Sequence, residues 1–238
     1  MKLQRKGTRH SHRGVIGVES AIVMIAFVIV AAALAFVVLN MGFTTSQKAK
    51  TSIISSLEEA SSSMQIAGKV IGAGDITNGK LNVTAFPIKV ASGGDNIDLN
   101  AKTAAVKYVS NSIDYDNIYV GTLSTTEYKS LSSAVNQAVD TEADGTYEPF
   151  SDIDVNPFDG VSQSSNTRAF VYFTQSSQST PNDILEQGET AVLAIVYKSS
   201  DRPSALDKIK AEIIVPSGAA LTVERQVPTI TNTIVDLG

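Results

Sequence analysis

Residues 13–42 read RGVIGVESAIVMIAFVIVAAALAFVVLNMG and decide the fold of this 238-residue chain. From Ala21 to Leu39, 19 residues carry neither a charge nor a side-chain amide. At about 1.5 Å per helical residue this stretch spans roughly 29 Å, which matches the hydrocarbon core of a bilayer. The stretch therefore predicts an apolar helix that is long enough to cross a membrane.

The helical pattern continues beyond the apolar run, but with a polar face. Serines and acidic residues separate the apolar side chains, which recur at helical spacing at Ile53, Ile54, Leu57 and Met64. We therefore predict one helix over residues 15–65, roughly 75 Å long at the same rise per residue.

Charge is distributed unevenly along the chain. Residues 1–14 hold five basic and no acidic residues, whereas the whole chain has 19 basic and 24 acidic residues and a net charge of -5. A basic head, an apolar segment and an acidic body are typical of an exported or membrane-anchored protein, with a cytoplasmic N-terminus and an external body. The acidic balance argues against a nucleic-acid partner.

The side-chain inventory restricts the chemistry of the body. The chain has no cysteine, and both of its histidines, His10 and His12, lie within the first twelve residues. Disulfides and thiolate sites are therefore excluded, and histidine-based catalysis is excluded from the rest of the chain. We identify no catalytic residues and no cofactor, and we predict that the protein is not an enzyme.

Three interpretations of the N-terminal segment compete. An ordinary secretory signal would be cut near the alanines at 31–35, and a single-pass anchor would not be cut at all. A prepilin-type signal would be cut before the apolar run, between Gly14 and Val15, so that the helix stays in the product. The long apolar run and the continuing helical pattern argue against the ordinary secretory signal, and nothing in the hydropathy excludes the anchor.

Glu19 favours the prepilin-type signal over the other two interpretations. A carboxylate beside an apolar run costs free energy unless it is paired. A favourable charge at the helix N-terminus, worth about 0.3–1 kcal/mol, is the simpler explanation. Cleavage would instead create an α-amino group on Val15, four residues from Glu19, which the carboxylate would neutralise in its own chain or in a neighbour.

Residues 13–42, with Gln47-Lys48-Ala49-Lys50 after them, resemble the archaeal flagellins (archaellins), most closely the crenarchaeal members. The resemblance is weaker at 185–189 and 215–219. It implies a leader over 1–14 that a prepilin-peptidase-like membrane protease removes, and a filament-core helix over 15–65 that spans the membrane before assembly. It also implies a homopolymeric extracellular filament that the archaellum machinery assembles and a membrane motor rotates for swimming.

The body, residues 66–238, is predicted to be an all-β immunoglobulin-like sandwich, which makes the whole chain an α+β protein. β-branched and aromatic runs separated by turn residues occur near 81–90, 106–109, 118–120, 170–173, 190–197, 209–215 and 221–224. One short helix is predicted near 127–138.

Two candidate sites lie in the body. Asp152, Asp154 and Asn156 begin like a calcium-binding loop, but Pro157 stands where that loop needs glycine, so a solvated surface loop is the better interpretation. Asn82-Val83-Thr84 is an N-glycosylation motif, usable if Asn82 faces outward.

The predicted helix has a physical consequence for assembly. A helix that is apolar on all sides must be buried in lipid or among other helices, and the small residues in it permit close approach between copies. Copies that meet head-to-tail without closing a ring form a filament. The alternatives are an adhesive pilus subunit made by the same processing and a membrane-anchored external binding domain that keeps residues 1–14.

Overall fold

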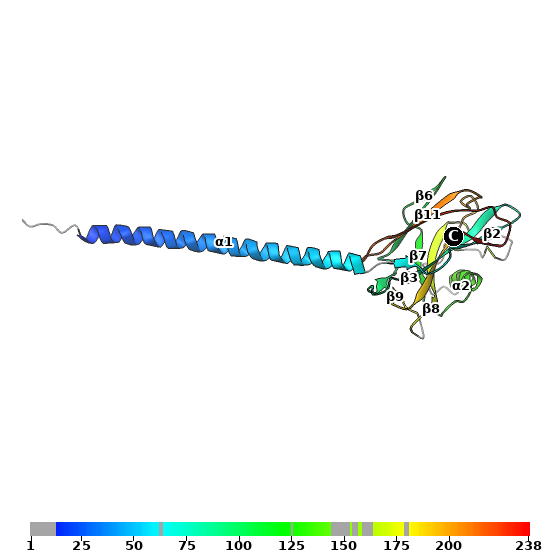
Figure 1. Cartoon of the computed structure of the whole chain (residues 1–238), viewed down its shortest axis with the longest axis horizontal. Coiled ribbons are helices and arrows are strands. Elements are labelled where there is room, and N and C mark those ends of the chain that lie inside the picture. Colours follow the sequence, from blue (N-terminus) through cyan, green and yellow to red (C-terminus); the bar gives the residue numbers. More distant parts are fainter. Residues whose placement is uncertain are drawn as a thin grey trace, which may run out of the picture. The chain divides into compact units, whose positions relative to one another are not determined.

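The computed structural model describes residues 13–61, 64–124, 126–143, 153, 157–158, 164–178 and 181–238. Within these ranges, only the backbone is described at 13–16, 55–61 and 140–143. The chain divides into two units, Met1–Ser55 and Ser56–Gly238, which contain a long helix and a β-rich body (Figure 1). The predicted α+β fold, a long N-terminal helix followed by a β-rich domain, is confirmed.

Helix α1 runs from Arg13 to Ser61 without interruption. It continues through Asn40 and Gly42, as the periodicity predicted. It ends four residues before the expected boundary at Gln65, which instead lies in strand β1 and pairs with Lys89. The serines at 61–63 explain the difference, because serine side chains compete for backbone hydrogen bonds and disfavour helix interiors.

In its described residues, the body contains one further helix and a series of strands. Helix α2 spans Leu131–Ala143, and it starts where Ser130 caps it, with the Ser133 backbone N–H donating to Ser130 Oγ at 3.2 Å. The strands are β1 (Met64–Ile66), β2 (Ile71–Asp75), β3 (Lys80–Val90), β4 (Ile97–Asp98), β5 (Ala105–Ser110), β6 (Asp114–Tyr115), β7 (Tyr119–Leu123), β8 (Arg168–Gln175), β9 (Ile184–Leu185), β10 (Thr190–Val196), β11 (Lys208–Ile214), β12 (Leu221–Gln226) and β13 (Ile234–Asp236).

Two sheets make up most of the body. The larger has the order β13-β2-β3-β10-β8-β7, with β1 also paired to β3, and the smaller has the order β12-β11-β5-β6. Strands β4 and β9 form a separate pair. Among the described strands, all pairs are antiparallel except β7 with β8, which are parallel and are joined through α2, as a parallel connection requires.

The core of the sandwich lies between the two sheets. Alternate residues of β10, Ala191, Leu193 and Ile195, share one buried cluster with Tyr108 and Ile209 of the smaller sheet. The sandwich arrangement of two packed sheets agrees with the prediction from short alternating strands.

The opposite face of the larger sheet is also covered. Val192, Ala194 and Val196 of β10 belong to a second buried cluster, which includes Ala134 and Val135 of α2. The body therefore has a third layer on one side, a feature that a simple two-layer sandwich lacks. The sequence signal for it is the unbroken apolar run AVLAIV in β10, because a strand buried on both faces does not alternate.

Pro87 lies in the interior of β3 without breaking the sheet. The Ala67 backbone N–H donates to the Pro87 carbonyl at 2.8 Å, so this side of β3 faces the segment that connects β1 to β2. In an extended strand the nitrogen and oxygen of one residue point to the same side, so the missing N–H faces the same gap. The ladder with β10, in which Pro87 pairs with Val192, is preserved.

Candidate functional site

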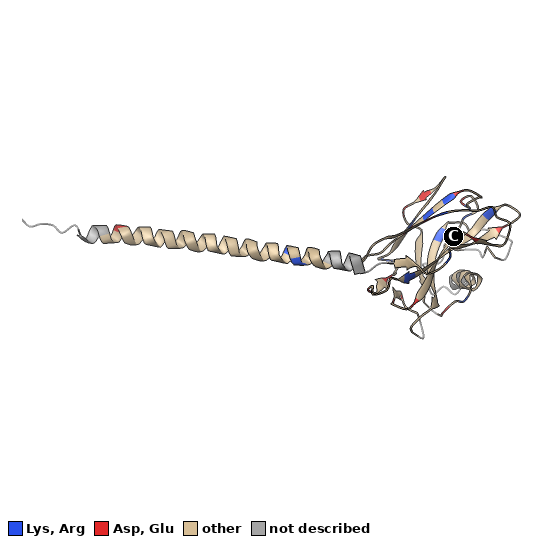
Figure 2. Ribbon diagram, in the orientation of Figure 1, with Lys and Arg blue, Asp and Glu red and all other residues tan. Residues whose placement is uncertain are grey.

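Between Val18 and Phe43, the surface of α1 is apolar and exposed around its whole circumference. Between Val18 and Phe43, sixteen large apolar side chains are each more than half exposed, and Phe27 reaches 76%. Residues 17–54 are long and apolar enough to cross a membrane, and none of the most apolar part is buried in the structure. Figure 2 shows this stretch without charge between an acidic residue near the helix start and basic residues farther along.

Exposure of these side chains requires a partner. Full burial of one large apolar side chain contributes about 1.5–3 kcal/mol, so sixteen of them represent a gross gain of tens of kcal/mol. No element of the described N-terminal unit covers them. The surface of α1 is therefore the candidate functional site, and its partners are lipid or other apolar helices.

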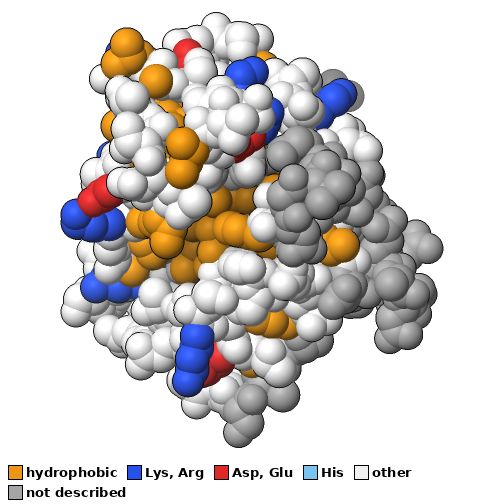
Figure 3. All heavy atoms as spheres, turned by 90° about the vertical axis from the view of Figure 1, so that its right-hand side faces the viewer, with side chains coloured by type: hydrophobic (Ala, Val, Ile, Leu, Met, Phe, Trp, Pro, Cys, Tyr) orange, Lys and Arg blue, Asp and Glu red, His pale blue; other side chains and the backbone are white. Residues whose placement is uncertain are grey.

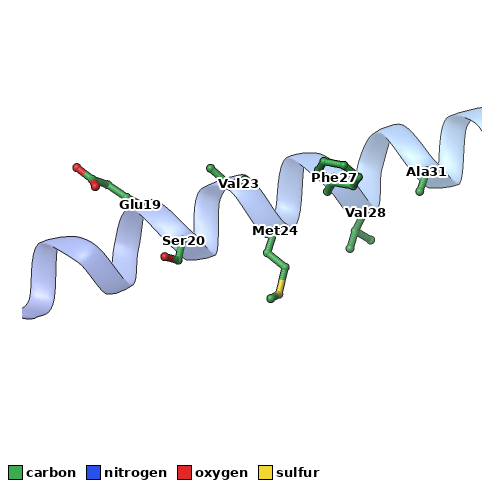
Figure 4. Close-up of a pocket in the computed structure, with 7 residues that line it drawn as sticks. All are labelled: Glu19, Ser20, Val23, Met24, Phe27, Val28 and Ala31. Atoms are coloured by element: carbon green, nitrogen blue, oxygen red, sulfur yellow. The ribbon is translucent and has the colours of Figure 1, made fainter.

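The first turns of this surface form a shallow groove between two rows of side chains (Figure 4). One row contains Glu19, Val23 and Phe27, and the other contains Ser20, Met24 and Val28, each at a spacing of four residues. Such rows are the ridges that pack into the grooves of a neighbouring helix. The groove is suited to receive a side-chain ridge from a second apolar helix.

At two positions of α1, nothing within the N-terminal unit requires glycine. A Cβ atom added at Gly17 or Gly42 would meet nothing within 4 Å. Glycine also lowers helix stability relative to alanine. The absence of an internal reason for these glycines fits a role in close approach between helices.

Glu19 is placed on the apolar surface as the sequence predicted. Among the side chains that the structure describes, none pairs with its carboxylate. Gly14 and Val15 lie in the first helical turn, where only the backbone is described. Cleavage between them and pairing of Glu19 with the new amine stay predictions.

Asn82 lies in β3, and its side chain is hydrogen-bonded to another residue of the body. Its Oδ1 accepts a hydrogen bond from Arg202 Nη1 at 3.0 Å, and the same nitrogen donates to Asp75 Oδ2 at 3.0 Å. The hydroxyl of Thr84, the other essential residue of the glycosylation motif, is fully buried against the Tyr197 hydroxyl at 2.8 Å. Glycosylation at Asn82 stays a prediction, and this burial implies that it would precede folding of the sheet.

The predicted calcium ligands Asp152, Asp154 and Asn156 lie outside the described residues. Within the described ranges, no cluster of three or more His, Cys, Asp or Glu side chains is suited to hold a metal ion.

The surroundings of two buried carboxylates of the body indicate a structural role. Glu189 is 3% exposed and accepts hydrogen bonds from the backbone N–H groups of Ser177 and Glu186, at 2.8 and 2.9 Å, and from the hydroxyls of Ser176 and Ser177. Burial raises the pKa of this carboxyl, but these four hydrogen bonds outweigh burial, and the pKa is lowered. Glu189 thereby ties the segment after β8 to the turn before β10.

Asp201 has a similar role near the other end of β10. It accepts hydrogen bonds from the hydroxyls of Thr167, Tyr115 and Ser200 at 2.7, 2.9 and 2.6 Å. Burial raises its pKa and the hydrogen bonds lower it, with a net lowering. Both carboxylates are occupied by donors of the chain itself, which is a stabilising arrangement.

One face of the body carries hydrophobic side chains at its centre, with charged side chains around them (Figure 3). The large apolar side chains that are most exposed in the body are Leu206 and Ile234, each 70% exposed, followed by Ile76. These residues are few compared with those of α1. Among the described residues, most of the exposed large apolar side chains lie on the helix.

Comparison with known proteins agrees with this assignment. The sequence model of the archaeal-type flagellin family matches residues 14–225. The protein named "Probable flagellin 1" of Aeropyrum pernix is 35% identical over 216 residues, which cover 91% of this chain and 92% of that protein. The protein of the same name from Archaeoglobus fulgidus is 28% identical over 221 residues, covering 92% and 91%.

Solved structures share the fold. The archaeal flagellum of Methanospirillum hungatei strain JF1 matches with a TM-score of 0.57 and 20% identity, covering 93% of this chain and 99% of that chain. Archaeal flagellin FlaB1 from Methanocaldococcus jannaschii matches with a TM-score of 0.55 and 18% identity, covering 74% and 96%.

Proposed function

Because the chain belongs to the archaeal-type flagellin family, we propose that it is the structural subunit of an extracellular flagellar filament, in which copies of α1 pack together to form the core. The observation that carries this proposal is the exposed apolar surface of α1, which no part of the described N-terminal unit buries. A bundle of copies buries it after the helix leaves the membrane. The β-rich body has its own buried cores and forms the outer layer of the filament.

Processing precedes assembly in this proposal. A prepilin-peptidase-like membrane protease cuts between Gly14 and Val15, and glycine suits the bond because the enzyme must approach the backbone closely. Two findings support this position: the family match begins at residue 14, and α1 begins at Arg13, so the bond lies in the first turn, where helices fray.

Before assembly, α1 spans the membrane with residues 1–14 on the cytoplasmic side. The five basic residues of the leader set this orientation, because positive charge is retained in the cytoplasm. Removal of the leader exposes the amine of Val15, and Glu19 neutralises it within the bundle, where an unpaired charge would be costly. Assembly machinery and a membrane motor act on this processed subunit, and rotation of the filament serves swimming.

The N-terminal sequence and intact mass of protein sheared from the cell surface test the processing step. We expect Val15 as the first residue and no polypeptide that retains Met1. Gly14→Val should keep the leader and prevent filament formation, whereas Gly17→Ala, a change at the next glycine, should leave cleavage unaffected. A surface filament whose subunits begin at Met1 would contradict the proposed processing.

A deletion strain tests the proposed role in swimming. Loss of the gene should remove the filament and abolish swimming, and complementation should restore both. A deletion strain that still swims but no longer attaches to surfaces would assign the filament to adhesion instead.

A further inference from the structure

The second half of α1 carries a row of uncharged polar side chains on one side. Asn40, Thr44, Gln47 and Thr51 follow a spacing of four, three and four residues, which keeps them on one helix face. Thr44, Gln47 and Thr51 also line one shallow groove of the helix surface, together with Lys48 and Ser52. We call these four residues the polar seam.

The hydroxyl groups of the seam are satisfied inside the helix. Thr44 Oγ1 donates to the Asn40 carbonyl at 2.7 Å, and Thr51 Oγ1 donates to the Gln47 carbonyl at 2.9 Å. A threonine that donates to its own helix in this way tolerates apolar surroundings. The hydroxyls therefore do not require solvent.

The amides of the seam are in a different state. Within the described part of the chain, the side-chain amides of Asn40 and Gln47 have no hydrogen-bond partner. Each amide can donate two hydrogen bonds and accept two, and an amide buried without partners is strongly unfavourable. Burial of α1 in a bundle therefore requires a polar group opposite each of them.

We propose that the polar seam pairs with the polar seam of neighbouring copies and fixes the axial register of the helices in the filament core. The inference rests on the proposed function, because it needs copies of α1 packed side by side. Seven residues separate the two amides, and a buried amide at such a spacing is a known device for selecting register between helices. A second copy supplies the required groups, since it presents the same amides at the same spacing.

The seam supplies directional contacts, which the apolar surface lacks. Apolar burial is non-directional, so helices that pack through Val, Ile and Phe alone can slide along each other at little cost. The two amides of neighbouring seams meet only when the helices are in line or offset by seven residues, about 10 Å along the axis. The seam therefore restricts neighbouring helices to these registers.

Cryo-electron microscopy of filaments from a strain that carries only this subunit tests the proposal. In the double variant Asn40→Leu/Gln47→Leu, the seam becomes apolar at similar volume. We expect filaments to form, because burial is retained, but with mixed helical symmetries within one preparation. The matched control Thr45→Val/Ser46→Ala removes two hydroxyls of the same helical turns outside the seam and should keep the wild-type symmetry.

A second variant tests burial of the seam in the filament. Gln47→Glu places one carboxylate per copy in the contact. Lys48 of the same groove offsets part of this charge, but a carboxylate buried between helices still strongly opposes association. We expect about tenfold less polymer at pH 8 than in the wild type, and recovery near pH 4, where the carboxyl is protonated.

The outcomes separate this inference from the proposed function. Absence of filaments in the wild type would contradict the proposed function itself. With wild-type filaments present, an unchanged single symmetry in the double Leu variant, or assembly of Gln47→Glu that is independent of pH, would show that the seam faces solvent and would overturn the inference.

Discussion

Replacement of Glu189 by glutamine should destabilise the body by about 2–4 kcal/mol at pH 7. Three of its four hydrogen bonds converge on Oε1, and the fourth, from the Glu186 N–H, goes to Oε2. A glutamine oxygen can keep the three bonds, but its NH₂ group then faces the Glu186 N–H, so that two donors oppose each other. The loss of one charge-assisted bond, about 1.5–3 kcal/mol, and the weakening of the others account for the expected cost.

The cost should depend on pH in a defined direction. The folded-state pKa of Glu189 is lowered from its ordinary value of 4.5, so its stabilisation is fully present above that value. The stabilisation is lost as the pH falls through the lowered folded-state pKa. The difference between the wild type and Glu189→Gln should therefore be constant from pH 8 to about pH 5 and shrink below it.

The assay is chemical unfolding of the whole chain in detergent, followed by near-ultraviolet circular dichroism. The chain has seven tyrosines and no tryptophan, and every tyrosine lies at position 108 or later, so the tyrosine band of this signal reports the body alone. Glu186→Gln is the matched control, because the hydrogen bonds of the Glu186 carboxylate with described residues are longer, at 3.2 and 3.3 Å. A Glu189→Gln variant within about 0.5 kcal/mol of the wild type at pH 7 would refute the reasoning.

The same unfolding signal checks three further changes. Gly74→Ala should destabilise by about 1–3 kcal/mol, because the added Cβ would lie 2.6 Å from Ile230 Cγ2; an unchanged midpoint would show that this contact relaxes freely. Phe170→Ala should cost about 3–5 kcal/mol, since the ring is fully buried in the cluster beneath α2, and a loss below about 1 kcal/mol would contradict that packing. Leu206→Asn should stabilise by about 1 kcal/mol, because Leu206 has a φ of 71° and is exposed; a lower stability would mean that its side chain makes an important contact.

Much of the architecture was predictable because its signals are local. The apolar run of α1 predicts a helix without help from the rest of the chain, and the β-branched runs of β8 and β10 likewise predict strands. The structure has a helix and two strands at these positions. Strand β13 was not predictable, because it has three residues and exists through its pairing with β2, more than 150 positions earlier. Its sequence alone carries too little pattern to distinguish it from a loop.

In the candidate site, too, the features with local signals were predictable and those that depend on distant residues were not. Glu19 and the apolar surface could be identified from sequence, because a helix that lacks a polar face requires partners whatever the rest of the chain does. The surroundings of Asn82 could not, since Arg202 lies 120 residues away and reaches it only through the fold. The hydrogen-bonded environments of Glu189 and Asp201 likewise depend on which turns the sheets bring together.

The attachment of β1 to β3 also sets how the body bears mechanical load. Tension drawn along the chain from α1 enters the body at Met64, whose strand pairs with Val90 to Ile88 of β3, and β3 is joined on its far side to β10. Force is therefore delivered to the middle of the larger sheet and not to an exposed edge. In a pulling experiment, the three residue pairs of β1 should yield first, which removes Met64 from its buried cluster and lengthens the tether slightly, while the remaining strands of that sheet stay paired.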